Sequence, residues 1–197
     1  MQKFPPIMGL SRALGLALGA AALLPAGAKA VDPADLHTLL QTGTCLNCDL
    51  RGADLRYQDL SGARLRGSNL TGANFFRAQL VNADLARANL TNANFSMANL
   101  QGTVLNWADM THSTLLGTNL TNASLVSTIL TNAYMEDTLL INAVLTEADM
   151  QQTKIVSADF TGLASVEPGS PMVTTGWGAL RVAAIFAPSK GPSEISH

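Results

Sequence analysis

Residues 78–95 read AQLVNADLARANLTNANF, and in this stretch a Leu or Phe returns at every fifth position. The same spacing continues without a slip from Leu50 to Phe160, always with Leu, Phe, Met or Ile. A small residue such as Ala83 stands two positions before nearly every one of them, and Gln58 is the clear exception. A period this regular indicates a repeat architecture.

A period of five fits neither an α-helix nor a flat β-strand. On a helix, a step of five residues turns the side chain by roughly 140°, so the apolar series would not stay on one face. On a strand, an odd step moves the side chain to the opposite face each time. The chain must therefore change direction once per unit, and four right-angle turns would close a coil of about 20 residues.

We therefore expect an all-β solenoid of stacked coils. Each unit would point one large and one small side chain inward, packed at the density of a protein interior. At Gln58 we expect either a hydrogen bond to interior backbone groups or a local bulge, because a buried amide without a partner is unfavourable.

These units resemble the pentapeptide-repeat family, whose pattern is A-[D/N]-L-x-x. Typical units are Ala53-Asp54-Leu55, Ala73-Asn74-Phe75 and Ala83-Asp84-Leu85. The resemblance extends over residues 46–162 and implies a right-handed quadrilateral β-helix. It implies little about activity, because most members of the family have no assigned biochemical role.

Residues 1–30 have the features of a secretory signal peptide. Lys3 and Arg12 give a positive start, residues 13–24 are largely apolar, and Ala28 and Ala30 form an A-x-A cleavage site. An apolar run of about 12 residues is shorter than the roughly 20 that a membrane-spanning helix needs. We expect an exported protein without a membrane segment after cleavage, and an uncleaved anchor stays open as the alternative.

Residues 31–45 are predicted to form a short N-terminal capping helix. Asp32 can serve as the N-cap, Pro33 suits the first helical position, and Gly43 can end the helix. Such a helix would cover the apolar side chains and unpaired backbone groups at the open end of the first coil.

Cys45 and Cys48 are the only cysteines, and they have C-x-x-C spacing. A metal site needs about four ligands, and the sequence offers no second pair of Cys or His to complete one. A redox-active pair usually opens a helix within a βαβ pattern, which is absent. A structural disulfide fits an exported protein, and the family resemblance also favours it. We predict the disulfide and keep the other two interpretations as alternatives.

The outward positions become more apolar in the late repeats. Val126, Ile129, Leu139, Ile141 and Val144 are expected to project from adjoining faces and to form a contact surface. The tail of the chain, a protein partner or a second copy could cover this surface.

Residues 163–197 are predicted to be a linker and C-terminal tail. The five-residue pattern has ended there, and Pro, Gly, Ser and Thr are frequent in residues 165–176.

Motifs for catalysis or cofactor binding are absent from the sequence. His37, His112 and His197 are scattered, and no catalytic triad, H-E-x-x-H, phosphate loop or dinucleotide fingerprint appears. We expect no enzyme activity, no cofactor and no metal.

The charge balance argues against a nucleic-acid partner. Removal of residues 1–30 takes away Lys3, Arg12 and Lys29 and leaves 9 basic against 14 acidic residues. Binding to a phosphate backbone needs a basic stripe instead.

Two functions remain. The first is a non-enzymatic exported scaffold that binds a protein partner, or itself, through the outer faces of the rod. The second, implied by one branch of the family, is a DNA mimic that inhibits or protects a type II topoisomerase. We prefer the first, because the outward column at positions 49, 69, 89, 109, 129 and 149 mixes Asp with neutral residues. The resemblance is to exported members of cyanobacterial type, for which periplasm and thylakoid lumen are both open as destinations.

Overall fold

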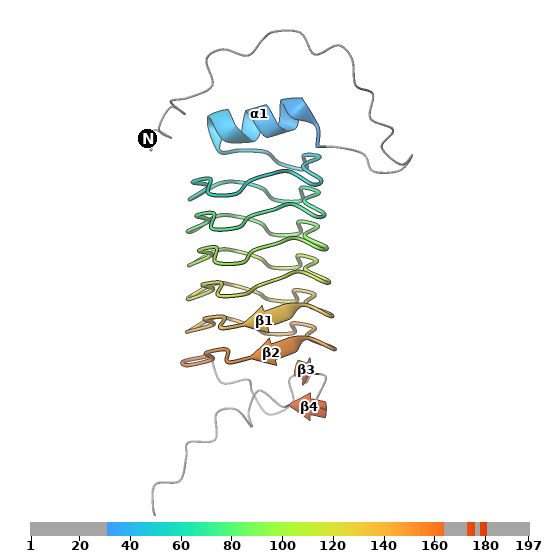
Figure 1. Cartoon of the computed structure of the whole chain (residues 1–197), viewed down its shortest axis with the longest axis vertical. Coiled ribbons are helices and arrows are strands. Elements are labelled where there is room, and N and C mark those ends of the chain that lie inside the picture. The colour runs from blue at the N-terminus through green and yellow to red at the C-terminus, as the bar shows by residue number, and fades with distance from the viewer. Residues whose placement is uncertain (1–30, 164–172, 176–177, 181–197) are drawn as a thin grey trace, which may run out of the picture.

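The computed structural model describes residues 31–163, 173–175 and 178–180. In this part of the chain, the backbone winds into a stack of coils below a single helix (Figure 1). The predicted signal peptide with Ala28 and Ala30 lies outside the described residues, as does most of the predicted tail.

Parallel bridges between residues 20 positions apart define the coil. Asp49 pairs with Asn69, Asn69 pairs with Asn89, and the same spacing recurs at nearly every fifth residue. Each coil therefore contains four five-residue units, as the period predicts.

Regular strands are short and few among the described residues. Strand β1 (Tyr134–Glu136) pairs in parallel with β2 (Lys154–Val156). Strand β3 (Val173–Thr175) pairs antiparallel with β4 (Gly178–Leu180), within the range predicted as a tail. Isolated bridges supply the other pairings between coils.

Units 20 residues apart stack into four sides, which we name by their central residues. Side A has its centres at positions 50 to 150, side B at 55 to 155, side C at 60 to 160 and side D at 65 to 145, each in steps of 20. The residues just before and just after the centre occupy the outer positions of a unit. The residue two after the centre is the corner.

The corner residue has left-handed backbone in every unit. The angle φ is positive at each corner from Asn47 to Gly162, for example 58° at Asn92 and 67° at Gly102. Gly and Asn tolerate this conformation better than other residues, which explains their frequency there. At Gly102 a Cβ atom would lie 2.3 Å from Oδ1 of Asn82 in the preceding coil, so the stacked amide leaves no room for a side chain.

The central residues and the small residues two before them fill the interior. Leu50, Leu90 and Leu140 are fully buried, and Phe75 stacks on Phe95 with ring centroids 4.8 Å apart. This close packing of large and small side chains confirms the predicted inward pair.

Threonine replaces alanine at several inner small positions and is hydrogen-bonded there. Thr103 Oγ1 donates to the Leu80 carbonyl at 2.7 Å, and Thr118 Oγ1 donates to the Phe95 carbonyl at 2.8 Å. Ser113 differs, because its buried Oγ has no hydrogen-bond partner among the described residues.

Gln58 behaves differently from both sequence-based expectations. The residue is half-buried, whereas nearly all residues at the inner small position are buried. The backbone carbonyl of Gln58 accepts the backbone N–H of Gln79 at 2.9 Å, and the bridge between Asp59 and Gln79 keeps the register of the other coils. The coil therefore keeps its register at Gln58 without a bulge.

Helix α1 (Pro33–Thr42) lies across the first coil (Figure 1). The Asp32 side chain accepts the N–H of Ala34, and Gly43 ends the helix with a φ of 67°. Leu39 is buried against the core. The Asp35 carboxylate accepts the N–H of Asp49 at 2.7 Å, which ties the helix to the first coil.

Candidate protein-contact surface

In the early coils, the outer position before the centre carries in most units an Asp or Asn side chain that caps the backbone. Oδ1 of Asn69 accepts the N–H of Thr71 at 3.2 Å, and Oδ1 of Asn89 accepts the N–H of Thr91 at 3.0 Å. The same Asx turn occurs at Asp54, Asp59, Asn74, Asp84, Asn94, Asn99, Asp109 and Asn119. Each such turn satisfies a backbone N–H at the outer surface.

In one full turn of the coil, four consecutive units have apolar side chains in place of the capping Asp or Asn. Four consecutive units carry Ile129, Tyr134, Leu139 and Val144 at the same outer position. Ile129 and Leu139 are 41% and 39% exposed. Because Ile, Leu and Val have no hydrogen-bond acceptor, the Asx turn cannot form at these units. We call these four residues the apolar belt.

The Asx turn returns after the belt. Oδ1 of Asp159 accepts both the N–H and the hydroxyl of Thr161, at 2.9 and 2.6 Å. These hydrogen bonds, the hydroxyl's above all, lower the pKa of the Asp159 carboxyl. Single units elsewhere also lack the cap, among them the one with Val104, but the belt is the run of four consecutive apolar units, and the caps return after it.

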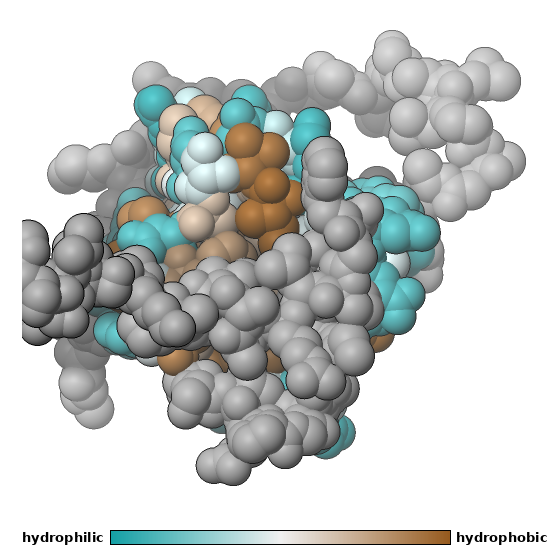
Figure 2. Space-filling view, turned by 90° about the horizontal axis from the view of Figure 1, so that it is seen from below, coloured by the Kyte–Doolittle hydropathy of each residue, from teal (hydrophilic) through white to brown (hydrophobic). Residues whose placement is uncertain are grey.

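The structure distributes the five residues of the sequence-predicted surface over three sides. Leu139 and Ile141 flank the same central residue on side C, Val126 and Val144 lie on side D, and Ile129 lies on side A. Val126 and Ile141 are half-buried. Figure 2, seen along the rod from below, shows hydrophobic residues reaching the surface between hydrophilic ones.

Tyr134 is the belt residue that sequence reasoning missed. Its hydroxyl donates to the Glu136 carboxylate, and this hydrogen bond raises the pKa of the phenol. The Lys154 ammonium lies 4.9 Å from the ring centroid. A signal was available, because Tyr134 stands where most units carry Asp or Asn, as Ile129 does.

Exposed aromatic residues in the early and middle coils were also missed. Trp107 is 53% exposed, and the guanidinium of Arg87 lies 5.4 Å from the centroid of the indole. Tyr57 packs edge-on against Phe76 with centroids 5.7 Å apart. Trp107 and Tyr57 occupy corners, where many other units carry Asn or Gly.

Two early arginines are neutralised by carboxylates in their own units. Arg51 Nε lies 2.7 Å from Asp49 Oδ1, and Arg56 Nε lies 2.7 Å from Asp54 Oδ1. The hydrogen bond from Arg56 lowers the pKa of the Asp54 carboxyl. This part of the surface is a mixed charged face, which agrees with the absence of a basic stripe in the sequence.

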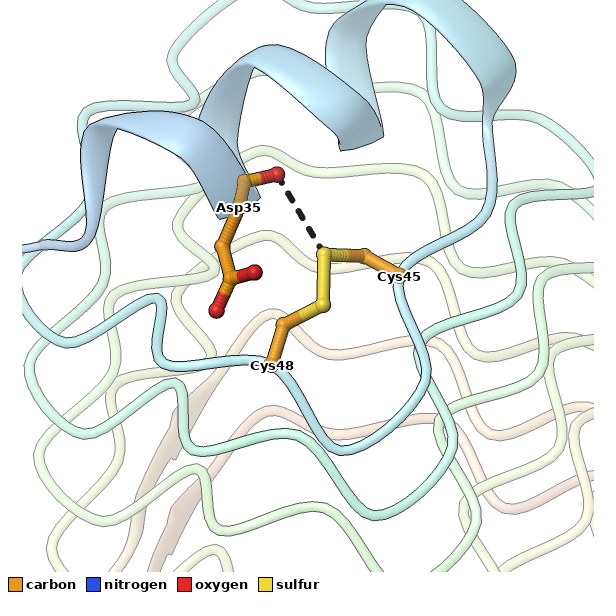
Figure 3. A group of neighbouring side chains, drawn as sticks. All are labelled: Asp35, Cys45 and Cys48. Atoms are coloured by element: carbon orange, nitrogen blue, oxygen red, sulfur yellow. Dashed lines mark hydrogen bonds between the residues drawn. A yellow bond between two sulfur atoms is a disulfide. The ribbon is translucent and has the colours of Figure 1, made fainter.

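Cys45 and Cys48 form the disulfide that the sequence favoured, with Cα atoms 5.5 Å apart (Figure 3). Cys45 Sγ lies 3.3 Å from the carbonyl oxygen of Asp35, so the bridge sits beneath the start of α1. Among the described residues, Asp35, Cys45 and Cys48 have potential ligand atoms within 4.8 Å of one another. The two sulfurs are bonded to each other and are not thiolates, so this group is a structural clasp.

The five-residue units stack with a filled interior, and they vary mainly at their outer and corner positions. This arrangement is that of a solenoid repeat protein, in which each coil contacts only its neighbours. The chain belongs to the pentapeptide-repeat family. The family profile, described as pentapeptide repeats in eight copies, matches residues 48–85, 68–106, 88–125, 104–140 and 130–162.

Several solved structures are similar to this chain. Rfr23, a pentapeptide repeat protein from the cyanobacterium Cyanothece 51142, is 21% identical over 64% of this chain and 92% of its own, with a TM-score of 0.48. QnrB1, a plasmid-mediated fluoroquinolone resistance protein, is 18% identical over 59% of this chain and 61% of its own, with a TM-score of 0.42. A pentapeptide repeat protein from the Arabidopsis thaliana thylakoid lumen is 30% identical over 51% of this chain and 70% of its own, with a TM-score of 0.34.

A comparison with curated proteins gave no significant match. Within residues 31–163, 173–175 and 178–180, no helix has the length and apolar character that crossing a membrane requires.

Proposed function

We propose that this protein is a non-enzymatic, exported scaffold that binds a protein partner through the late coils of a right-handed, four-sided β-helix. The apolar belt is the observation that carries the proposal. Residues 1–30 serve as the signal peptide, and the mature protein works in the periplasm or the thylakoid lumen.

The belt is unfavourable for the isolated chain in two ways. Each belt unit gives up an Asx hydrogen bond of the kind that contributes about 1 kcal/mol net. Each also exposes apolar area to water, at about 25 cal/mol per Å². The coil does not require these residues, because Ile129 still bridges Asp149 and Leu139 still bridges Asp159. A partner that covers the belt accounts for both features.

Sides C and D present the larger continuous part of the surface. Sides A and C are two units apart in the coil, so in a four-sided rod Ile129 faces away from Leu139. Leu139 and Ile141 on side C adjoin Val126 and Val144 on side D. These four residues form the main contact surface for the partner, which also reaches around the rod to Tyr134 on side B and Ile129 on side A.

Site-specific photo-crosslinking tests this proposal, with a photoreactive amino acid at position 139 or at position 99. Asn99, Asn119 and Leu139 occupy the same outer position in three successive coils of side C. Asn99 therefore serves as the matched control. Full-length protein is expressed in its host, irradiated, and recovered from the exported fraction. We expect a defined crosslinked protein from position 139 and none from position 99. Equal products from both positions, no product from either, or a mature protein confined to the cytoplasm would overturn the proposal.

The topoisomerase alternative receives less support from the surface charge. On side A, Asp49, Asp109 and Asp149 share one bridged column with Asn69, Asn89 and Ile129. The acidic residues in this column are never adjacent, so the column does not reproduce the unbroken charge of a phosphate backbone. A gyrase supercoiling assay with the mature protein should show neither inhibition nor protection, and either effect at micromolar protein would reverse the ranking.

A further inference from the structure

One corner column at the margin of side D carries an ordered set of side chains. From coil to coil it reads Arg87, Trp107, Ser127 and Glu147, that is, basic, aromatic, polar and acidic. Arg87 lies against the Trp107 ring, and Ser127 Oγ donates to the Glu147 carboxylate at 2.8 Å. We call these four residues the side D strip.

The strip keeps large side chains where the backbone disfavours them. The angle φ is 59° at Arg87, 59° at Trp107 and 59° at Glu147. Left-handed backbone costs roughly 1–2 kcal/mol for a residue with a Cβ atom, and Gly or Asn would relieve much of this penalty. Large side chains occupy other corners too, such as Met97, so it is the order of charges along the strip that points to a role outside the fold.

The charges of the strip are unmatched within the described part of the chain. Neither Arg87 nor Glu147 forms an ion pair with a described residue, and both are exposed. Arg64 and Arg66 add two more exposed cations at the same end of side D, and neither forms an ion pair with a residue that the structure describes. Side D is therefore basic toward α1 and carries Glu147 toward the other end.

We propose that a second copy of this chain packs antiparallel against side D. A twofold axis that lies in the contact plane and crosses the rods keeps each column opposite itself and reverses its order. Arg87 of one copy then faces Glu147 of the other, and Trp107 faces Ser127 beside the half-buried Val126. In a parallel pair, a twofold axis along the rods would place the strip opposite the other margin of side D, whose corners are Gly or Asn (62, 82, 102, 122 and 142) and carry no charge. Charge therefore favours the antiparallel arrangement.

The size of side D makes this dimer a weak one. The five units of side D at about 4.8 Å give a length of roughly 24 Å, and five residues at about 3.3 Å give a width of at most roughly 16 Å. Such a side buries at most about 800 Å² in total, below the 1,200–2,000 Å² of stable complexes. Asp84 also lies on side D and gains no cation from this pairing. The association is thus concentration-dependent and sensitive to salt.

Sedimentation equilibrium of the mature full-length chain tests the dimer with a charge exchange. Arg87→Glu and Glu147→Arg should each weaken the dimer about tenfold or more, because each places like charges opposite one another. The double variant restores an opposite-charge pair, and we expect its dissociation constant to return to within about threefold of the wild-type value. A wild-type chain that stays monomeric up to millimolar concentration, or a double variant no tighter than the single ones, would overturn the proposal.

Trp107→Gly removes the aromatic contact without harming the left-handed corner. We expect it to weaken the dimer about tenfold while the far-ultraviolet circular dichroism and unfolding midpoint hold or improve. Met97→Gly makes the same change at an exposed corner outside side D, where φ is 60°, and should leave the dimer unchanged. Equal effects of the two variants would contradict the assignment. The second copy and the proposed partner would compete for side D, because Val126 and Val144 belong to both contacts. Leu139→Asn on side C removes a contact of the partner alone and should not alter the dimer, so the two proposals fail separately.

Discussion

The early coils and the coil that carries the apolar belt share one interior and differ at one outer position. Leu90 and Leu130 on side A are both fully buried, and the N–H of each donates to the next coil at 2.7 Å. Just before them, Asn89 caps the backbone whereas Ile129 cannot. The comparison indicates that the buried side chains and the backbone hydrogen bonds between coils stabilise the rod. The outer position is therefore not constrained by the fold and can serve in binding.

The largest expected effect tests whether the two interiors are equivalent. Leu90→Ala and Leu130→Ala should each lower the free energy of unfolding by about 2–5 kcal/mol, because both delete a fully buried side chain and leave a cavity. Urea unfolding measures both values. A much smaller loss for Leu130→Ala would show that the late coil is loosely packed and that the comparison fails.

Reduction of the disulfide should separate the two regions. The loop between Cys45 and Cys48 is short, so its opening should cost about 2 kcal/mol on the chain-entropy description. In a rod of nearest-neighbour contacts this loss should stay near α1 and the first coil. Hydrogen exchange with and without reductant measures it by segment. Equal acceleration in the belt would indicate that the rod opens as one cooperative unit.

An exchange of the two outer residues on side A should give effects of opposite sign. Asn89→Ile removes the acceptor for the Thr91 N–H and should lower the free energy of unfolding by about 1 kcal/mol. Ile129→Asn creates an acceptor for the Thr131 N–H and should raise it by a similar amount. If both variants are destabilised, the outer position of the belt has a structural role.

The smallest effect concerns the interior polar groups. Ser113→Ala removes a buried hydroxyl without a partner among the described residues and should stabilise the protein by up to about 1 kcal/mol. Thr118→Ser is the matched control, because it keeps the hydroxyl that bonds to the Phe95 carbonyl. A loss of stability in Ser113→Ala would show that the hydroxyl has a partner in solution.

The period of five was sufficient to predict the coil, because a residue type repeated at a fixed step determines which side chains meet inside. Local patterns also predicted the N-cap at Asp32 and the disulfide between Cys45 and Cys48. Contacts between side chains of different coils were harder to predict from the sequence. The bond from Asp49 to Asp35 and the contact of Arg87 with Trp107 join residues that become neighbours only after the chain has wound.

The contact surface was predicted in composition but not in shape. The sequence shows that the late repeats have apolar residues at outer positions. The side of the rod on which each residue lies, however, depends on the place of its unit in the 20-residue coil. Ile129 and Leu139 differ by ten residues and therefore lie on sides two units apart. Tyr134 was missed because apolar character was judged by aliphatic residues, whereas the absence of Asp or Asn was the more general signal.

The central claim is that the belt exists for contact and not for the fold. The most direct test is urea unfolding of a variant in which Ile129, Tyr134, Leu139 and Val144 are all replaced by Asn. We expect its unfolding midpoint to rise above that of the wild-type protein, because four caps are gained and exposed apolar area is removed. A midpoint below the wild-type value would contradict the claim and would show that the belt packs against another segment of its own chain.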